Sequence, residues 1–406
     1  MNDEMIDYVK KVNAQDCAVL KFNVKRIVIK LVESKVETVQ RMNDKFYLVA
    51  LRKGERGFTG KLDNLEGEPT LVPSSIAPRV SDNDRQILKV KESNVDKLMD
   101  DVSPLLNLES KFPLYGIITV EKVERSLVTS SGFNGKEEGS GVSGYFRAKN
   151  GEYSGQWAFS STNFSEKQVK DAIERANQYA SITGKAQITD GKYDLVLSPL
   201  VMGNLMMDVA RMASGFAIYS GMSMMNPGDK VGSDNFTLLD TPREDRPDSW
   251  AFDDEGVFTY NKAIIENGVF KQPLLNIELS PFFKANSTGN AGWLYPRAWN
   301  LEVKEGDESV DSMVSGNVIL INNVWYTRFQ NYVEGTFSTV ARDASVVYKE
   351  GNPVGIAERI RIADSLKKIM QTEAISKERF SVRWWDAPMQ GVYPFVLVKG
   401  VKVTKA

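Results

Sequence analysis

Residues 145–159 have the sequence YFRAKNGEYSGQWAF, two aromatic-containing runs on either side of Asn150-Gly151. Asn and Gly both tolerate the positive φ angles of a type I′ turn, so this stretch predicts a tight antiparallel hairpin. A second pair, Asn267-Gly268, stands between Ile264-Ile265 and Val269-Phe270 and predicts another hairpin. We therefore expect antiparallel sheet in both halves of the chain.

Alternation of apolar and polar residues predicts more strands in the first half, after a short helix that carries Met5, Val9 and Val12. The predicted strands are 18–22, 27–31, 46–50, 115–121 and a run near Leu127. The turn-like residues 53–57 close the third strand, which indicates hairpins rather than crossover connections.

Two capping signals predict helices in the same half. Ser165 and Gln168 form a capping box for a helix that Gly184 ends, and Ser93 precedes a helix over 95–102.

Two further stretches, 66–84 and 130–143, are predicted as surface loops because they are rich in Gly, Ser, Pro and charged residues. The second contains most of residues 139–144, GSGVSG, which matches a dinucleotide-binding fingerprint superficially. Because this run precedes a hairpin instead of opening a helix, the dinucleotide interpretation fails.

The second half begins with a predicted strand over 193–198 and a Met-rich helix from Met202 to Phe216, apolar along one face. An extended, charged loop over 240–249 follows. Further predicted elements are strands over 318–321, 345–348 and 395–403 and a late helix over 356–370. The predicted class is α+β: an N-terminal α/β domain of antiparallel strands and helices over 1–188, and a C-terminal, mostly antiparallel β domain with a few helices over 189–406.

Composition limits the function. The 51 basic and 53 acidic residues nearly cancel, so no global positive field attracts nucleic acid. The N-terminus, Met1-Asn2-Asp3-Glu4, is acidic where a signal peptide is basic, and no apolar run approaches a membrane span. We expect a cytoplasmic protein. The single cysteine, Cys17, opens an apolar run and is predicted to be a buried small hydrophobe.

The chain contains no histidine. Ser-His and Cys-His nucleophilic pairs and any His-ligated zinc site are therefore impossible within this chain. Carboxylate and lysine chemistry remain open, so the absence excludes mechanisms without proving inactivity.

Residues 253–256, Asp-Asp-Glu-Gly, concentrate three carboxylates just before a strand. They suit a hard-cation site or an acid/base pair, but successive residues seldom converge on one ion, so we favour a solvated turn. Residues 286–292, Asn-Ser-Thr-Gly-Asn-Ala-Gly, form a second polar segment whose N–H groups are able to line a concavity for a carbonyl or carboxylate. No lysine follows these glycines as in a P-loop, and a plain loop stays an equal alternative.

In order and spacing, several segments resemble the TldD/PmbA family, once described as modulators of DNA gyrase and now linked to peptidases. The segments are Phe252-Asp253-Asp254-Glu255-Gly256-Val257, then Ile264-Ile265-Glu266-Asn267-Gly268-Val269, then Ser287-Thr288-Gly289-Asn290-Ala291 and Pro296-Arg297. The N-terminal half agrees with the family in pattern only.

The resemblance implies a zinc helix, His-Glu-x-x-x-His, in TldD-type subunits and a further cysteine ligand near their C-terminus. Here Met207, Asp208 and Met212 stand at the positions of that motif, and no cysteine occurs near 384–389. The chain therefore looks like the zinc-free TldE/PmbA-type subunit, inactive alone and without a cofactor of its own. Such a subunit pairs with a TldD-like zinc subunit, or forms a homodimer, to enclose a chamber for unfolded or modified peptides.

The resemblance implies a set of substrate-binding residues: Asp253, Asp254, Glu255, Asn286, Ser287, Thr288, Gly289, Asn290 and Arg297. Two alternatives stay open. One is an independent peptide- or protein-binding module without enzymatic activity. The other is a hydrolase that uses the carboxylates of 253–255 with another metal.

Overall fold

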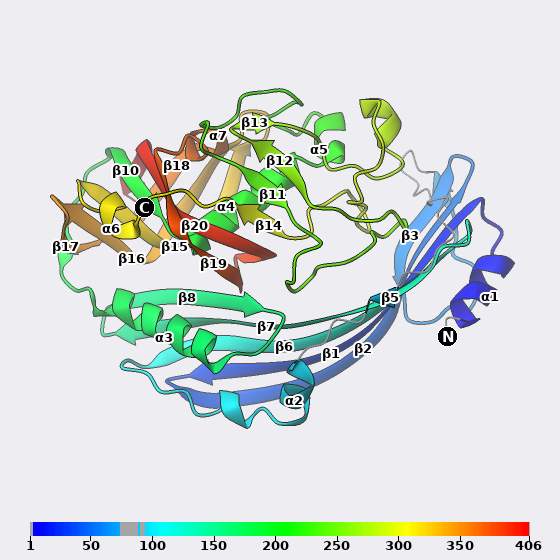
Figure 1. Ribbon diagram of the computed structural model, residues 1–406, viewed down its shortest axis with the longest axis horizontal. Helices are drawn as coiled ribbons and strands as arrows, with labels where there is room; N and C mark the ends of the chain where they lie inside the picture. The colour runs from blue at the N-terminus through cyan, green and yellow to red at the C-terminus, as the bar shows by residue number, and fades with distance from the viewer. Residues whose placement is uncertain (1–2, 74–87, 90–93, 406) are drawn as a thin grey trace.

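Most of the molecule is β-sheet. The structure is a computed structural model that describes residues 3–73, 88–89 and 94–405. Strands hold 48% of the residues and helices 17%, so the predicted α+β class is confirmed, with strands in the majority. In Figure 1, sheet A curves along the long axis, with sheet B over one end and an irregular segment over the other.

Sheet A contains eight strands in the described part of the chain, in the order β4-β3-β2-β1-β6-β7-β5, with β8 also on β7. The predicted hairpin is confirmed, because β7 and β8 pair antiparallel with Asn150 opposite Tyr153. Its turn lies one residue later than predicted, at Gly151-Glu152: Asn150 is the last residue of β7, and Gly151 has the positive φ, 59°. The strands are β1 Asp16–Val32, β2 Lys35–Lys53, β3 Arg56–Leu62, β4 Val72–Pro73, β5 Leu88–Lys89, β6 Leu114–Thr129, β7 Asn134–Asn150 and β8 Tyr153–Ser161.

Helices pack on sheet A through small apolar faces. α1 (Asp3–Lys11) buries Met5 and Tyr8 in a cluster that includes Cys17. Cys17 is 1% exposed, and burial raises the pKa of its thiol to about 12. The prediction that Cys17 is a buried small hydrophobe is therefore confirmed. The other helices of this half are α2 (Val95–Asp100), the 3₁₀ turn η1 (Ser103–Leu105) and α3 (Glu166–Ser181).

The predicted helix starts are correct in part. Ser165 is the N-cap residue of α3, but its side chain makes no capping hydrogen bond, so the capping box is wrong in that detail. α2 ends at Asp100, short of the predicted 102, and the proposed cap at Ser93 lies outside the described residues. Of the predicted loop over 66–84, only 66–73 are described, and they include β4.

Sheet B is mixed and contains twelve strands among the described residues. Asn267 and Gly268 have φ angles of 49° and 72°, as the predicted turn requires, between β12 and β13. The strands are β9 Lys185–Ala186, β10 Gly191–Leu197, β11 Leu238–Asp240, β12 Lys262–Glu266, β13 Val269–Phe270, β14 Leu301–Val303, β15 Val318–Asn331, β16 Thr336–Lys349, β17 Asn352–Ala357, β18 Ile360–Ser365, β19 Ala374–Trp384 and β20 Ala387–Lys405. The helices of this half are α4 Pro199–Met212, α5 Gly215–Tyr219, η2 Ser280–Phe283, α6 Val310–Met313 and α7 Leu366–Ile369.

The two sheets share a hydrophobic core. One cluster joins residues of sheet A and α3 to residues of β15, β16 and β20. Trp157 of β8 stacks on Phe395 of β20 with ring centroids 6.0 Å apart. Burial of these large rings from both sheets makes the seam between the sheets a packed interface.

The predicted loop over 130–143 is wrong, because β7 runs through most of it. Its glycines leave room for a segment that lies on sheet A. A Cβ atom at Gly139 would meet the Trp250 ring at 2.9 Å, and one at Gly141 would meet Pro247 at 3.1 Å. The glycine-rich composition therefore reflects close approach of another segment and not a loop.

The predicted helix over 356–370 is also wrong. The chain forms β17, a turn at Arg359, β18 and only a single helical turn, α7. Ile360 and Ile362 are buried on either side of exposed Arg361, which is the two-residue period of a strand. A short apolar run fits both the helical and the strand period, so the sequence alone does not distinguish them. Here the pairing of β18 with β16 and β20 favours the strand.

The Met-rich helix exists but is not one-sided. It ends at Met212 and is followed by the separate helix α5, and Arg211 is the one exposed residue of α4. Asn204 and Asp208, two polar residues of this helix, are both buried. The amide of Asn204 donates to the carbonyl oxygen of Asp386 at 2.6 Å, which satisfies a polar group inside the core.

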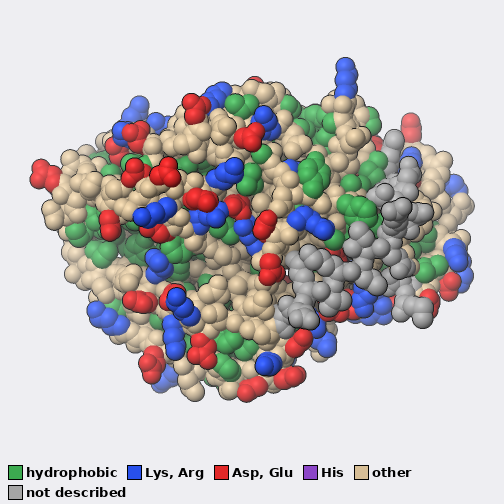
Figure 2. Space-filling view, in the orientation of Figure 1, with side chains coloured by type: hydrophobic (Ala, Val, Ile, Leu, Met, Phe, Trp, Pro, Cys, Tyr) green, Lys and Arg blue, Asp and Glu red, His purple; other side chains and the backbone are tan. Residues whose placement is uncertain are grey.

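The charge distribution agrees with the balanced composition. On the face shown in Figure 2, basic and acidic side chains are interspersed, without a single-sign patch. None of the described helices is both long and apolar enough to cross a membrane.

The seat of α3 on β8 gives a test of the fold. A Cβ atom at Gly155 would lie 2.3 Å from Tyr179 Cβ and 2.5 Å from the Ala176 carbonyl oxygen, both on α3. We expect Gly155→Ala to lower the free energy of unfolding by about 1–3 kcal/mol, because neither obstacle is a flexible side-chain end. Gly316→Ala, where no atom lies within 4 Å, should change it by less than about 0.5 kcal/mol. Equal effects in urea denaturation would contradict this packing.

Candidate functional site

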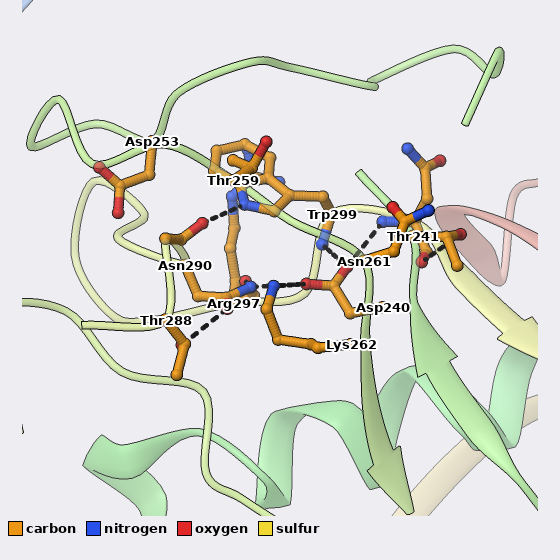
Figure 3. A network of polar contacts seen from close by, with 12 residues as sticks. Asp240, Thr241, Asp253, Thr259, Asn261, Lys262, Thr288, Asn290, Arg297 and Trp299 are labelled. Atoms are coloured by element: carbon orange, nitrogen blue, oxygen red, sulfur yellow. Dashed lines mark hydrogen bonds and ion pairs between the residues drawn. The ribbon is translucent and has the colours of Figure 1, made fainter. Parts of the chain in front are cut away.

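The predicted substrate-binding residues meet between β11 and β14, in a mostly irregular segment interrupted by the β12–β13 hairpin. They lie around a buried carboxylate that the sequence did not single out (Figure 3). Asp240, at the end of β11, is fully buried. Its Oδ2 lies 3.1 Å from the Lys262 ammonium and accepts a 2.7 Å hydrogen bond from the Asn290 amide. Its Oδ1 accepts from the backbone N–H of Trp299 at 2.8 Å. One carboxylate thus fastens three separate stretches of chain.

The Thr288-Gly289-Asn290 segment is buried and held by its own hydrogen bonds. Thr288 Oγ1 lies 2.8 Å from Asn290 Oδ1 and accepts from the Leu275 N–H at 2.7 Å. The Trp299 indole N–H donates to the Gly289 carbonyl at 2.9 Å. Gly289 has φ +67°, and a Cβ there would lie 2.6 Å from the Phe258 carbonyl oxygen, so this position requires glycine.

Other members of the segment remain accessible. Asn286 is exposed, Ser287 is half-buried and donates to the Leu275 carbonyl, and Arg297 is exposed with its guanidinium 4.3 Å from the centre of the Trp299 ring. Of the predicted substrate-binding residues in this loop, Asn286 and Arg297 are therefore the ones that present side chains to solvent.

Asp253, Asp254 and Glu255 form a turn, as favoured, but the prediction that it is solvated is wrong, since all three are buried. Asp253 Oδ1 accepts from the N–H groups of Glu255 and Val257 at 3.0 and 2.9 Å, and Oδ2 accepts from the Ala291 N–H at 3.0 Å. The turn is buried because its carboxylates provide the acceptors that these backbone donors need.

Two of these carboxyl groups titrate together. Burial raises the pKa of Asp253 to about 7, against the effect of its three backbone donors, and burial with the neighbouring Asp253 charge raises the pKa of Glu255 well above its usual range. Glu255 accepts one backbone hydrogen bond, from Ile277 at 2.8 Å. Because hydrogen bonds to the charged form favour it, Asp253 ionises first and Glu255 keeps its proton.

Arg125 connects this turn to sheet A and was not anticipated. The residue is 1% exposed, lies 3.0 Å from Glu137 and 3.3 Å from Asp254, and donates to the Phe252 carbonyl. Its guanidinium lies 4.7 Å from the centre of the Phe252 ring. The one sequence signal was the charge of Arg125 and Glu137 on facing strands β6 and β7.

A cavity of about 540 Å³ opens beside the turn, between strands β2 to β4 of sheet A and the irregular segment. Asp254, Glu255 and Glu278 line it together with the rings of Trp293 and Tyr295. Carboxyl groups beside aromatic faces are suited to contact the polar backbone and the side chains of an extended peptide.

The positions matched to the zinc motif lie elsewhere, on α4, and all three are buried. Asp208 is paired with Arg211 at 2.8 Å, and burial raises the pKa of its carboxyl. Arg211 also lies 3.7 Å from the sulfur of Met207. Two thioethers and a carboxylate held by an arginine do not fit a zinc site, which takes imidazole, thiolate or free carboxylate ligands. Within the described ranges, no three His, Cys, Asp or Glu side chains converge as a metal site requires.

Residues 190–405 match the family model of the PmbA/TldA metallopeptidase C-terminal domain. The chain is 28% identical over 149 residues to the zinc metalloprotease TldD homolog of Saccharolobus solfataricus. That alignment covers 34% of this chain and 33% of the relative, so the similarity spans about a third of its length.

Two solved structures share the fold along the chain. TldE from Thermococcus kodakarensis superposes with a TM-score of 0.80 at 16% identity, over 99% of each chain. A Thermotoga maritima protein described as a modulator of a DNA gyrase superposes with a TM-score of 0.79 at 17% identity, again over 99% of each chain. At these identities the likeness concerns the fold alone.

The proton on Glu255 predicts that the stability of the fold depends on pH. Below pH 4.5, the ordinary pKa of glutamate, folded and unfolded chains both hold the proton of Glu255. As the pH rises, the unfolded chain loses it while the folded chain keeps it, so stability falls by up to about 1.4 kcal/mol per pH unit. We expect Glu255→Gln to be more stable than the wild type at pH 7 in thermal unfolding, with the difference closing toward pH 4.5.

Asp253→Asn provides the matched control, because an amide has one acceptor oxygen where three N–H groups need two. It should be less stable by about 1–3 kcal/mol at pH 7. A Glu255→Gln effect that does not vary with pH would contradict the assignment of the proton to Glu255.

The Arg125 cluster predicts a large loss of stability on removal of the cation. Arg125→Met leaves Glu137 and Asp254 buried without their partner, which should cost about 3–5 kcal/mol in denaturant unfolding. Lys185→Met removes an ion pair that is about half exposed, with Glu152 and Glu358, and should cost less than about 1 kcal/mol. Similar costs for the two variants would show that Arg125 does not hold the turn on sheet A.

Proposed function

The chain belongs to the PmbA/TldA metallopeptidase family, and from this membership we propose that it is the zinc-free, chamber-forming subunit of a TldD/TldE-like peptidase complex. The complex degrades unfolded or modified peptides in the cytoplasm. The catalytic zinc belongs to the partner, and this chain shapes the chamber and holds substrate.

The observation that carries the proposal is the chemistry of α4. Where the TldD-type motif calls for two histidines and a glutamate, α4 has two buried methionines and an aspartate bound to Arg211. Zinc peptidases attack the amide with a metal-bound water whose pKa the metal lowers to about 7. Thioethers and a paired carboxylate give no equivalent grip, so hydrolysis needs another subunit.

Substrate binding is assigned to the 540 Å³ cavity and its rim. Asp254 and Glu255 line the cavity, and Asn286 and Arg297 present polar side chains from the neighbouring loop. Four further residues support the site indirectly, because their hydrogen bonds fix the shape of both loops: Asp253, Thr288, Gly289 and Asn290. An extended peptide gains affinity here mainly from polar contacts, with little dependence on its sequence.

A hetero-oligomer is favoured by the similarity in fold to the Thermococcus protein named TldE. We also propose that the chain divides near residue 188. Sheet A ends with β8 at Ser161, α3 ends at Ser181, and the long strands of sheet B begin at Gly191, which supports this boundary.

The proposal predicts that activity appears only on mixing. The purified chain should contain no stoichiometric zinc by atomic emission and should cleave no peptide. Added to a TldD-type protein with an intact His-Glu-x-x-x-His helix, it should form a hetero-oligomer by size-exclusion light scattering, with zinc and peptidase activity in the complex. Asp208→Asn should leave both unchanged, since Asp208 holds no metal here.

Stoichiometric zinc and metal-dependent cleavage by the chain alone would contradict the proposal. Persistence as a homodimer beside the TldD-type protein would instead favour an independent peptide-binding module.

A further inference from the structure

A second cavity, of about 470 Å³, lies in the seam between the two sheets. Strands β1, β6, β7 and β8 of sheet A form one side of it, and β15, β16 and the β19–β20 turn form the other. Its volume is within the range of small-ligand sites and is separate from the cavity assigned to the substrate above.

Arg342 brings a positive charge to this cavity. Its guanidinium lies 3.9 Å from the centre of the Trp325 ring. Desolvation, and next the neighbouring Arg147 charge, lower the pKa of Arg342. Arg147 forms an ion pair with Asp343 at 2.5 Å, whereas the guanidinium of Arg342 makes no ion pair or hydrogen bond with the described residues. The carboxylates of Asp343 and Asp386 counter this lowering through space, and Asp386 also lines the cavity.

Two buried donors border the same cavity without partners. Gln156 Nε2 and Trp384 Nε1 have no hydrogen-bond partner in the described structure, and their exposures are 6% each. An unsatisfied buried donor is costly, and native proteins leave few of them. Two such donors beside an unpaired guanidinium match an anionic ligand that accepts several hydrogen bonds.

The backbone at this cavity is strained on both facing strands. Tyr326 on β15 and Asp343 on β16 have φ angles of 57° and 62°, although neither is glycine. The register of β15 and β16 shifts between Trp325 and Arg328. Bulges and left-handed residues of this kind concentrate at binding sites, where they direct a side chain toward a ligand.

The mouth of the cavity is aromatic. Tyr326 is 61% exposed and Trp385 is 77% exposed, while Gln156 and Trp384 at the inner end are buried. The polar donors thus lie deep and the apolar rings lie outward. A ligand with a carboxylate at its tip and an apolar, planar group behind it matches this gradient.

We propose that this cavity binds the C-terminal carboxylate of a peptide whose last residue is aromatic. Arg342 receives the carboxylate, Gln156 and Trp384 donate to it, and Trp385 and Tyr326 flank the terminal ring. The choice of a peptide as ligand rests on the proposed function. The cavity is tied to α4 through the Asn204 amide, which donates to the Asp386 carbonyl one helical turn before Asp208.

The test uses fluorescence anisotropy of the full-length chain with fluorescein-labelled Ala-Ala-Phe, as the free acid and as the C-terminal amide. We expect the acid to bind about tenfold to a hundredfold more tightly than the amide. Arg342→Gln should remove this difference. Arg361→Gln, at an exposed position on β18, should preserve it. Equal affinity of acid and amide for the wild-type chain would overturn the proposal.

A second variant keeps the test decisive if Arg342→Gln unfolds. Trp385→Ala removes an exposed ring without touching the charge and should weaken binding of the acid peptide several-fold at an unchanged melting temperature. Unchanged affinity would overturn the assignment of the mouth. Fluorescein-labelled phenylalanine alone, if it binds as tightly as the tripeptide, would overturn the assignment to a peptide end. No partner or zinc is present, so failure of this binding and failure of the peptidase complex are separate results.

Discussion

The position of the motif turn depends on one buried cation. Arg125 lies on β6 with 1% of its surface exposed, and its guanidinium pairs with the carboxylates of Glu137 and Asp254 through two different nitrogens. Glu137 also accepts from the Ala251 N–H at 2.7 Å, so the same ion pair grips backbone and side chain of the turn. Because an unpaired charge in this setting is strongly unfavourable, sheet A and the turn must form together.

A chain of hydrogen bonds connects this turn to Asp240. The turn at Asp253 holds Ala291 through its carboxylate, and the adjacent Asn290 reaches Asp240 at the end of β11. Lys262 neutralises Asp240 from the start of β12, so a second buried ion pair seals the other side of the segment. A stretch with little regular secondary structure is thus fixed by charges whose donors and acceptors are almost all internal.

Features that depend on neighbouring residues could be predicted from the sequence, whereas contacts between residues far apart in the sequence could not. The Asn267-Gly268 turn and the start of α3 at Ser165 depend on neighbouring residues, and both were found. The strand through Gly139 was missed because its glycines make room for Trp250, more than a hundred residues away. The buried state of Asp253 was missed for the same reason, since its donor at Ala291 is distant in sequence. Asp240 and Arg125 gave no local signal, because a lone charged residue on a strand or beside a loop is usually solvated.

Charge pairing also explains why α4 can be buried. A helix that binds a metal ion must keep its ligands free of other ion pairs and open to a cavity. On α4, Asp208 is paired with Arg211, and the methionines are packed in the core. One turn earlier on the helix, the Asn204 amide donates a hydrogen bond to the carbonyl oxygen of Asp386 in the β19–β20 turn. Asp386 also lines the cavity that contains Arg342. Arg342, a half-buried cation without an ion pair among the described residues, lines that cavity. The charge that this helix region offers to a ligand is therefore a guanidinium, which is suited to an anion and not to a metal ion.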